Sequence, residues 1–232
     1  MSKLFPPTRA IYSHCGTGAC MNILNYFWDT TFGSKDTLDV ETMIRFGYFD
    51  WNGRPSEMEI LLFLAQMEFE IEIYTQFPWY YELLIQDPSS HAKYFWYEPY
   101  PLVSTDRNRI AVEKILNHSN VKFIEDETLN LPEIMRKKSD GDYLFLIGLD
   151  GYKIHNREKP EGEHGGHIMM STGYISTESD LIRLYETSPA SMIDRTVREI
   201  AVAQDIDEWL CIENTCIPIL LWDLYVISQK SA

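Results

Sequence analysis

Apolar residues near the N-terminus recur at helical spacing directly after a glycine-rich turn. Those on one predicted helix face fall at positions i, i+3, i+4 and i+7, namely Cys20, Ile23, Leu24 and Phe27. Polar residues fall on the opposite side of the same segment: Asn22, Asn25 and Asp29. The pattern predicts a helix that begins beside Cys15 and packs against the core through its apolar face.

The rest of the first half combines predicted helices with one strand. The helices are expected at residues 40–44, at residues 58–69, after Asp106 and at residues 131–138. The second of them has the clearest start, because Ser56 and Glu59 match the capping box. Residues 71–74 alternate between apolar and polar side chains, as a half-buried strand does. A dense run of aromatic residues and prolines at 77–100 either lines a binding groove or packs a long connection.

Apolar runs in the second half predict an antiparallel sheet. Strands are expected at residues 143–149, 152–154, 167–174, 181–186 and 217–227, the first two joined by the hairpin signal Asp150-Gly151. A helix is expected after Pro189, with an apolar face made of Ile193, Val197, Ile200 and Ala201. Helices thus come first and the sheet second, which predicts an α+β fold in a single domain over residues 1–232.

Composition and charge narrow the classes of function. The chain has 232 residues, of which 45% are hydrophobic, enough for a sizeable core. Its formal net charge of -15 argues against nucleic-acid binding, because Lys and Arg supply most of the affinity for phosphates. A basic partner or substrate fits this charge better. The sequence shows neither an apolar run of about 18 residues nor the apolar core of a signal peptide, so we expect a cytoplasmic protein without a membrane span.

Four cysteines form two C-x-x-x-x-C pairs at opposite ends of the chain: Cys15 with Cys20, and Cys211 with Cys216. They are too few for a disulfide scaffold of this size, and a reducing compartment would keep them as thiols. A zinc site made of four thiolates is an alternative, but the paired cysteines of structural zinc sites usually lie closer together in sequence. We therefore expect no metal and no cofactor. Nothing in the pattern indicates an oligomeric state.

One arrangement of residues is suited to nucleophilic catalysis. Cys15 precedes the first helix, whose unpaired backbone N–H groups and positive dipole end lower the pKa of a thiol. His167 opens a strand directly after Gly165-Gly166, which lets other backbone or a substrate approach it, and it is the best base. Glu186, at the end of the next strand, could orient the imidazole. Taken singly, each has a structural interpretation: a small buried thiol, a histidine at a strand end and a carboxylate that caps a helix.

Two motifs carry a resemblance to a known family. Residues 15–27, CGTGACMNILNYF, together with GHIMM at 166–170 and Gly173-Tyr174, resemble the papain-fold cysteine peptidases that process double-glycine bacteriocin leaders, and their stand-alone relatives. In that family the Cys before Gly is the nucleophile, the His that opens the strand is the base, and an Asp before Pro orients it. The resemblance implies a papain-like fold with Cys15, His167 and, in place of the Asp, Glu186 in these roles. The helix at 131–138 also precedes the first sheet strand as it does there.

The sequence departs from the family at two positions. Arg9 stands where the family has the Gln of the oxyanion hole, which leaves backbone N–H groups near Cys15 as donors. Glu186 is one methylene longer than the usual Asp, so it must reach the imidazole from a shifted backbone.

We therefore expect a cysteine hydrolase or peptidase that forms a thioester acyl-enzyme on Cys15, with a peptide or acyl substrate. Two alternatives stay open. The start of the motif, Ser13-His14-Cys15-Gly16, also resembles the butirosin-type acyltransferases, papain-like enzymes that move an acyl group from a carrier thioester to an amine. The other alternative is a catalytically silent peptide-binding module of the same fold, which uses the aromatic segment as a groove.

Overall fold

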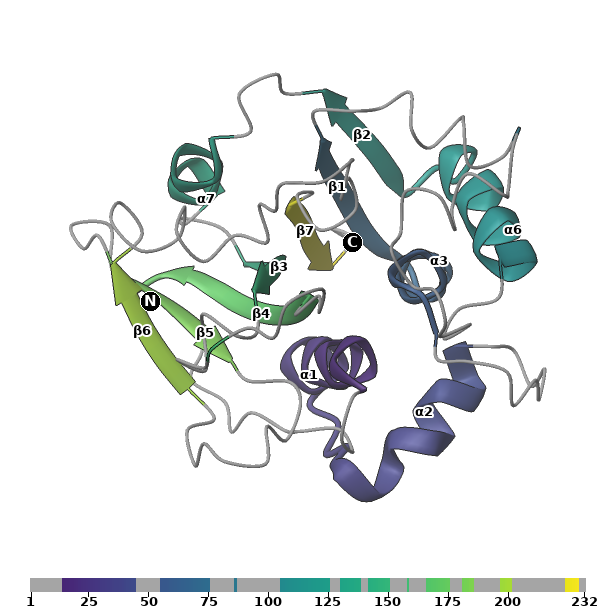
Figure 1. Ribbon diagram of the computed structural model, residues 1–232, viewed down its shortest axis with the longest axis horizontal. Coiled ribbons are helices and arrows are strands. Elements are labelled where there is room, and N and C mark those ends of the chain that lie inside the picture. The colour runs from purple at the N-terminus through teal and green to yellow at the C-terminus, as the bar shows by residue number, and fades with distance from the viewer. Residues whose placement is uncertain are drawn as a thin grey trace.

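The computed structural model describes residues 14–44, 55–75, 86, 105–125, 130–138, 142–150, 158, 166–175, 181–185, 197–201 and 224–229. Helices cover both faces of a central, mostly antiparallel sheet in these ranges (Figure 1). The architecture is therefore α+β, as the sequence predicted. No helix of the described ranges is long and apolar enough to cross a membrane.

Helix α1 (Cys15–Trp28) begins where the sequence predicted and ends at Asp29, which adopts a left-handed conformation with φ of 51°. It is buried on more sides than its apolar pattern implies. Asn22, placed on the polar face by its spacing, is fully buried, and its side-chain Nδ2 donates to the carbonyl oxygen of Gly18 at 2.9 Å. The prediction of a single buried face was wrong at this position, because a hydrogen bond within the helix satisfies the amide and allows its burial.

Two further helices follow α1. A short 3-10 turn, η1 (Ser34–Asp36), leads into α2 (Thr37–Ile44). Helix α3 (Glu57–Gln66) has the predicted capping box: the Glu59 N–H donates to Ser56 Oγ at 3.2 Å, and the Ser56 N–H donates to Glu59 Oε2 at 2.8 Å. The helix stops before residue 69, where it was expected to end, because Glu68 has φ of 65° and turns the chain into strand β1 (Phe69–Thr75).

In the middle of the chain, the described residues form two further helices and a strand. They are α6 (Thr105–Leu116), β2 (Val121–Glu125) and α7 (Leu131–Lys138). Helix α7 has the predicted bounds, and Asn130 caps it by accepting the Glu133 N–H at 3.2 Å. Strand β2 was not predicted. It pairs with β1, and these two strands run parallel to each other.

In the described part of the chain the sheet has seven strands, in the order β2-β1-β7-β3-β4-β5-β6. Its later strands are β3 (Tyr143–Asp150), β4 (Gly166–Tyr174), β5 (Leu181–Tyr185), β6 (Val197–Ala201) and β7 (Leu224–Gln229). Strand β7, the last in the chain, lies between β1 and β3 and pairs antiparallel with both. The expected order of helices first and sheet second is therefore only partly right, because β1 and β2 belong to the same sheet.

One predicted element has the wrong type. Residues 197–201, expected on a helix face, form the edge strand β6 and pair with β5 from Leu181↔Ala201 to Tyr185↔Val197. Val197 and Ile200 are β-branched residues, which favour strands, and pairing with a neighbouring strand overrides a short helical pattern. Strand β3 pairs with β4 and β7. The expected return strand at 152–154 lies outside the described residues, as do Pro189 and most of 217–227.

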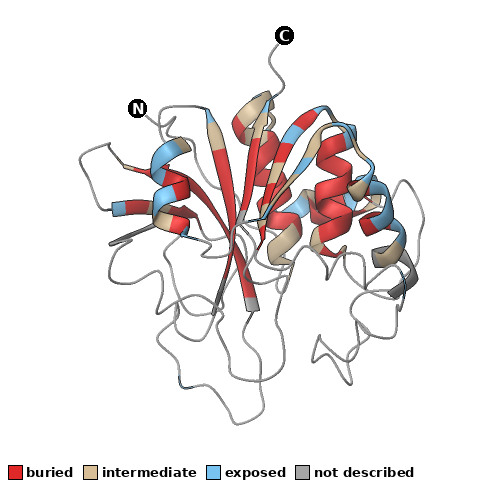
Figure 2. Cartoon of the chain, turned by 90° about the horizontal axis from the view of Figure 1, so that it is seen from above, coloured by how far each residue is buried: buried red, intermediate tan, exposed pale blue. Residues whose placement is uncertain are grey.

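Strands β3 and β4 are buried on both faces of the sheet, and Figure 2 shows buried residues along its central strands. Strand β1 alternates between buried and more exposed residues, and β2 has no buried residue. Side chains of β3 alternate between two cores. Leu144 and Leu146 pack on the side of α1 and α3, whereas Phe145 and Ile147 pack on the side of α7. The described part of the chain thus places α1 and α3 on one face of the sheet and α7 on the other.

Gly173 provides a test of the packing between β3 and β4. Its φ is +79°, and a Cβ at this position would lie 2.9 Å from Cε2 of the Phe145 ring. Gly173→Ala should lower the free energy of unfolding by about 2 to 4 kcal/mol, because it adds both backbone strain and overpacking. Denaturant unfolding of the purified protein measures this. In a Phe145→Leu background Gly173→Ala should lower the free energy of unfolding by less, since the Phe145→Leu change relieves the contact but not the strain. No loss at all in that background would contradict the backbone explanation.

Candidate active site

The N-terminus of α1 brings the Cys15 thiol to the start of β4. Cys15 is the first residue of the helix and is half-buried. Its sulfur is hydrogen-bonded to the side chain of His167, and the backbone N–H of Ile168 donates to the same sulfur. The structure therefore brings together the thiol and the imidazole that the sequence selected, from elements about 150 residues apart in the chain.

The sheet fixes the imidazole. His167 is the second residue of β4, and it pairs in the sheet with Leu149 of β3. Its side chain is 8% exposed, and the next residue, Ile168, belongs to the core under α1 and α3. A buried ring on a paired strand has little freedom, so the thiol meets an imidazole in a defined position.

Close helix packing fixes the thiol. A Cβ on Gly16 would lie 2.8 Å from Cδ1 of Ile60 on α3, so only glycine fits this approach without movement of Ile60. One turn further along α1, Ala19 is fully buried. Small side chains at these two positions let the first turn of α1 lie against α3 and the sheet, and this places Cys15.

The surroundings of Cys15 act on its pKa in both directions. Burial raises the pKa of the Cys15 thiol, because it disfavours the charged thiolate. The hydrogen bond to His167 and the positive charge of that imidazole lower it, and so does the Ile168 N–H. The net result is a Cys15 pKa below the ordinary value for a thiol, even though the nearby Glu57 raises it. Unpaired N–H groups in the first turn of α1 lie at the positive end of the helix dipole, which acts in the same favourable direction.

Cys20 has the opposite environment. It is fully buried in the core, as its place on the apolar face predicted, and this burial raises the pKa of its thiol far above the ordinary value. Several other predicted positions lie outside the described residues: Arg9, His164, Glu186, Cys211 and Cys216. The third residue of the expected constellation is therefore not placed. Within the described ranges, no three His, Cys, Asp or Glu side chains are grouped as metal ligands.

A polar cluster beside the thiol was missed at the sequence level. Glu41 of α2 is buried and contacts His14 Nδ1 through Oε1, and Thr17 Oγ1 donates to the same oxygen at 2.8 Å. These contacts tie α2 to the residues on either side of Cys15. Sequence spacing gives no signal for them, because the pairs are separated by more than 20 residues. The cluster therefore fixes the start of α1. The contacts described for it involve His14 and Thr17 and not the Cys15 sulfur.

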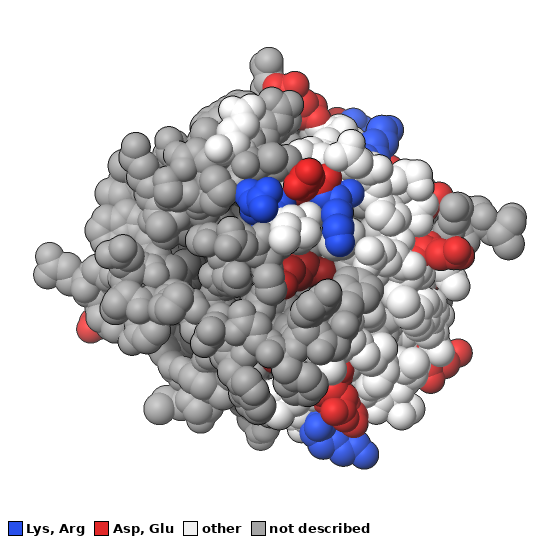
Figure 3. Space-filling view, turned by 90° about the vertical axis from the view of Figure 1, so that its right-hand side faces the viewer, with Lys and Arg blue, Asp and Glu red and all other residues white. Residues whose placement is uncertain are grey.

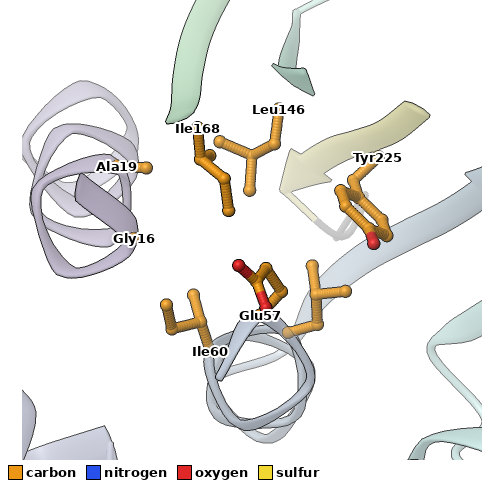
Figure 4. Close-up of a pocket in the computed structure, with 8 residues that line it drawn as sticks. Gly16, Ala19, Glu57, Ile60, Leu146, Ile168 and Tyr225 are labelled. Atoms are coloured by element: carbon orange, nitrogen blue, oxygen red, sulfur yellow. The ribbon is translucent and has the colours of Figure 1, made fainter. Parts of the chain in front are cut away.

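A small pocket lies on the inner side of the same helix start (Figure 4). It is lined by residues of α1, α3 and the sheet, namely Gly16, Ala19, Glu57, Ile60, Leu61, Leu146, Ile168 and Tyr225. Most of these side chains are apolar. Gly16 and Ile168 directly follow Cys15 and His167 in the sequence, so the pocket adjoins the thiol and imidazole.

Selective labelling tests the contrast between the two described cysteines. Brief treatment with iodoacetamide near neutral pH should modify Cys15 in preference to Cys20, because the first thiol has a lowered pKa and partial exposure, whereas the second is buried and protonated. Peptide mass spectrometry reads out the modified position. Cys15→Ser serves as the control and should abolish the fast phase. Preferential labelling of Cys20 would contradict the assignment of the reactive thiol.

No protein-family model matches this chain, and neither the curated proteins nor the solved structures gave a significant match. The site is therefore interpreted from its own geometry and chemistry.

Proposed function

We propose that this chain is a cysteine-dependent hydrolase of the peptidase type, which acts through a thioester acyl-enzyme on Cys15 in a papain-like fold. The observation that carries the proposal is the hydrogen bond between the Cys15 sulfur and the His167 imidazole at the start of α1. A thiol nucleophile needs a base within hydrogen-bond reach, and this pair supplies both groups. A purely structural thiol has no need of a lowered pKa, which argues against the silent binding module.

The arrangement of elements supports the papain-like assignment. The nucleophile lies on a buried N-terminal helix, and the base lies on an antiparallel strand against which this helix packs. The remaining member of the expected triad, Glu186, directly follows β5, the neighbour of β4 in the sheet. We therefore retain Glu186 as the proposed orienting residue.

The proposed reaction uses the two residues in turn. The Cys15 thiolate attacks the carbonyl carbon of an amide, and the tetrahedral oxyanion accepts hydrogen bonds from backbone N–H groups at the start of α1. As the carbon–nitrogen bond breaks, the His167 imidazolium donates its proton to the departing amine and leaves a thioester on Cys15. Water then attacks the thioester while His167 accepts a proton from it. Release of the carboxylic acid expels the Cys15 thiolate and restores the starting pair of thiolate and imidazolium.

The charge of the chain bears on the substrate. A formal net charge of -15 favours a substrate with basic groups, whose approach it would accelerate. Figure 3 shows acidic side chains spread over the described surface of one face, with basic side chains beside several of them. On that described surface the acidic side chains are scattered and are not gathered in one patch.

The pH dependence of alkylation tests the thiol and imidazole pair. A free thiol has a pKa of about 8.5. Because His167 lowers the pKa of Cys15, the midpoint of thiolate formation at Cys15 should lie well below this value. His167→Ala should move the midpoint upward, since burial then raises the pKa of Cys15 with only the Ile168 N–H and the helix dipole opposing it. Glu186→Gln should move it less and in the same direction. An unchanged profile in a folded His167→Ala protein would show that the imidazole does not act on the thiol, and would favour the binding module.

Trapping the acyl-enzyme tests the reaction itself. Incubation with a panel of peptide, ester and acyl-thioester substrates should add the acyl mass to Cys15, and Cys15→Ser should lower turnover by at least roughly a thousandfold. Circular dichroism checks that the variant is folded. Release of the acyl group to water supports a hydrolase, whereas release that requires an added amine would identify the acyltransferase alternative. Absence of any acyl adduct across the panel would count against an enzyme of this type.

A further inference from the structure

A carboxyl group that the proposed reaction does not use lines the pocket next to Cys15 and is near enough to act on the charge of its thiol. Glu57 is the first residue of α3 and shares one helix face with Ile60 and Leu61, at positions i, i+3 and i+4. The same face packs against α1, where Ile60 lies under Gly16. Figure 4 shows that the Glu57 carboxyl projects from α3 into the pocket, toward Ile168 and Leu146.

The position of Glu57 is unfavourable for a permanent negative charge. The side chain is half-buried among apolar groups, and burial is the main reason that the pKa of Glu57 is raised. Its own backbone N–H lowers this pKa, and the negative charge of Glu59 raises it further. The carboxylate that caps this helix start is that of Glu59, which accepts from the Ser56 N–H, so Glu57 does not have this role.

We propose that Glu57 regulates the nucleophile: the neutral carboxyl permits the thiolate of Cys15, and the ionised carboxylate opposes it. The inference rests on the proposed role of Cys15 and adds a second titrating group to that site. The reasoning is electrostatic. Two negative charges that share one partly buried region disfavour each other, so each group should titrate at a higher pH when the other is ionised. Glu57 acts through Cys15 and has no assigned contact with the substrate.

Other titratable groups lie near Cys15 and Glu57 on the elements that pack around them. They are Glu59 on α3, His167 on β4 and Tyr225 on β7, which lines the same pocket. On α2, Glu41 faces the start of α1, where it contacts His14 and Thr17. Of the described groups, His167 stabilises the thiolate and Glu57 opposes it. Together with burial and the Ile168 N–H, these two groups set the pH range of the nucleophile.

Glu57→Gln tests this coupling, with the alkylation rate of Cys15 recorded from acidic to alkaline pH. The variant and the parent should react equally at the acidic end, where Glu57 is neutral, and at the alkaline end, where both thiols are fully ionised. Between these limits the variant should react about three- to tenfold faster, because it lacks the opposing charge. The ratio of the two rates should therefore pass through a maximum.

Two further variants make the result specific. Glu133→Gln removes one carboxylate from α7, on the opposite face of the sheet. The ratio of its alkylation rate to that of the parent should stay at unity across the pH range. Glu57→Asp retains a titrating carboxyl and should keep a profile close to that of the parent. A flat ratio for a folded Glu57→Gln protein would overturn the inference while leaving the proposed function intact. By contrast, loss of the His167 dependence described above would defeat the proposed function whatever Glu57→Gln shows.

Discussion

The packing of α1 against strand β4 and helix α3 is the constraint on which both the core and the site depend. Gly16 allows α1 to approach Ile60 closely, and the buried residues that follow it hold the helix on the sheet. Cys15 is the first residue of the same helix, so the packing that stabilises the core also sets the sulfur beside His167 and the Ile168 N–H. A shift of α1 would disturb the core and the nucleophile together.

The site balances the cost of burying a charge against fixed groups that stabilise it. Burial alone would keep the Cys15 thiol protonated. It does so for Cys20, which lies about one and a half turns further along α1. The difference between the two cysteines is the presence of His167 and a backbone donor beside the first. Because these groups belong to a paired strand, they need little rearrangement when negative charge forms, which is the property that catalysis by preorganised dipoles requires.

Local sequence signals predicted the elements whose boundaries are determined by nearby residues. The start of α1, the capping box at Ser56 and the bounds of α7 are examples, and the strand position of His167 allowed it to be paired with Cys15. The signals failed where distant partners decide the structure. Strand β6 forms because β5 offers it hydrogen bonds, β2 because it pairs with β1, and the burial of Glu41 depends on His14 and Thr17. Glu57 gave no signal for the same reason, since its place beside the thiol follows from how two helices cross.

The amount of thiolate in the unmodified protein tests the central claim most directly. Thiolates absorb in the ultraviolet and thiols do not, so a pH titration of the absorbance follows the ionisation of Cys15 without any reagent. The account predicts one thiolate per chain near neutral pH. This thiolate should be absent from Cys15→Ser, and in His167→Ala it should form only at higher pH. A native protein that shows no thiolate until the range of a free thiol, about 8.5, would contradict it.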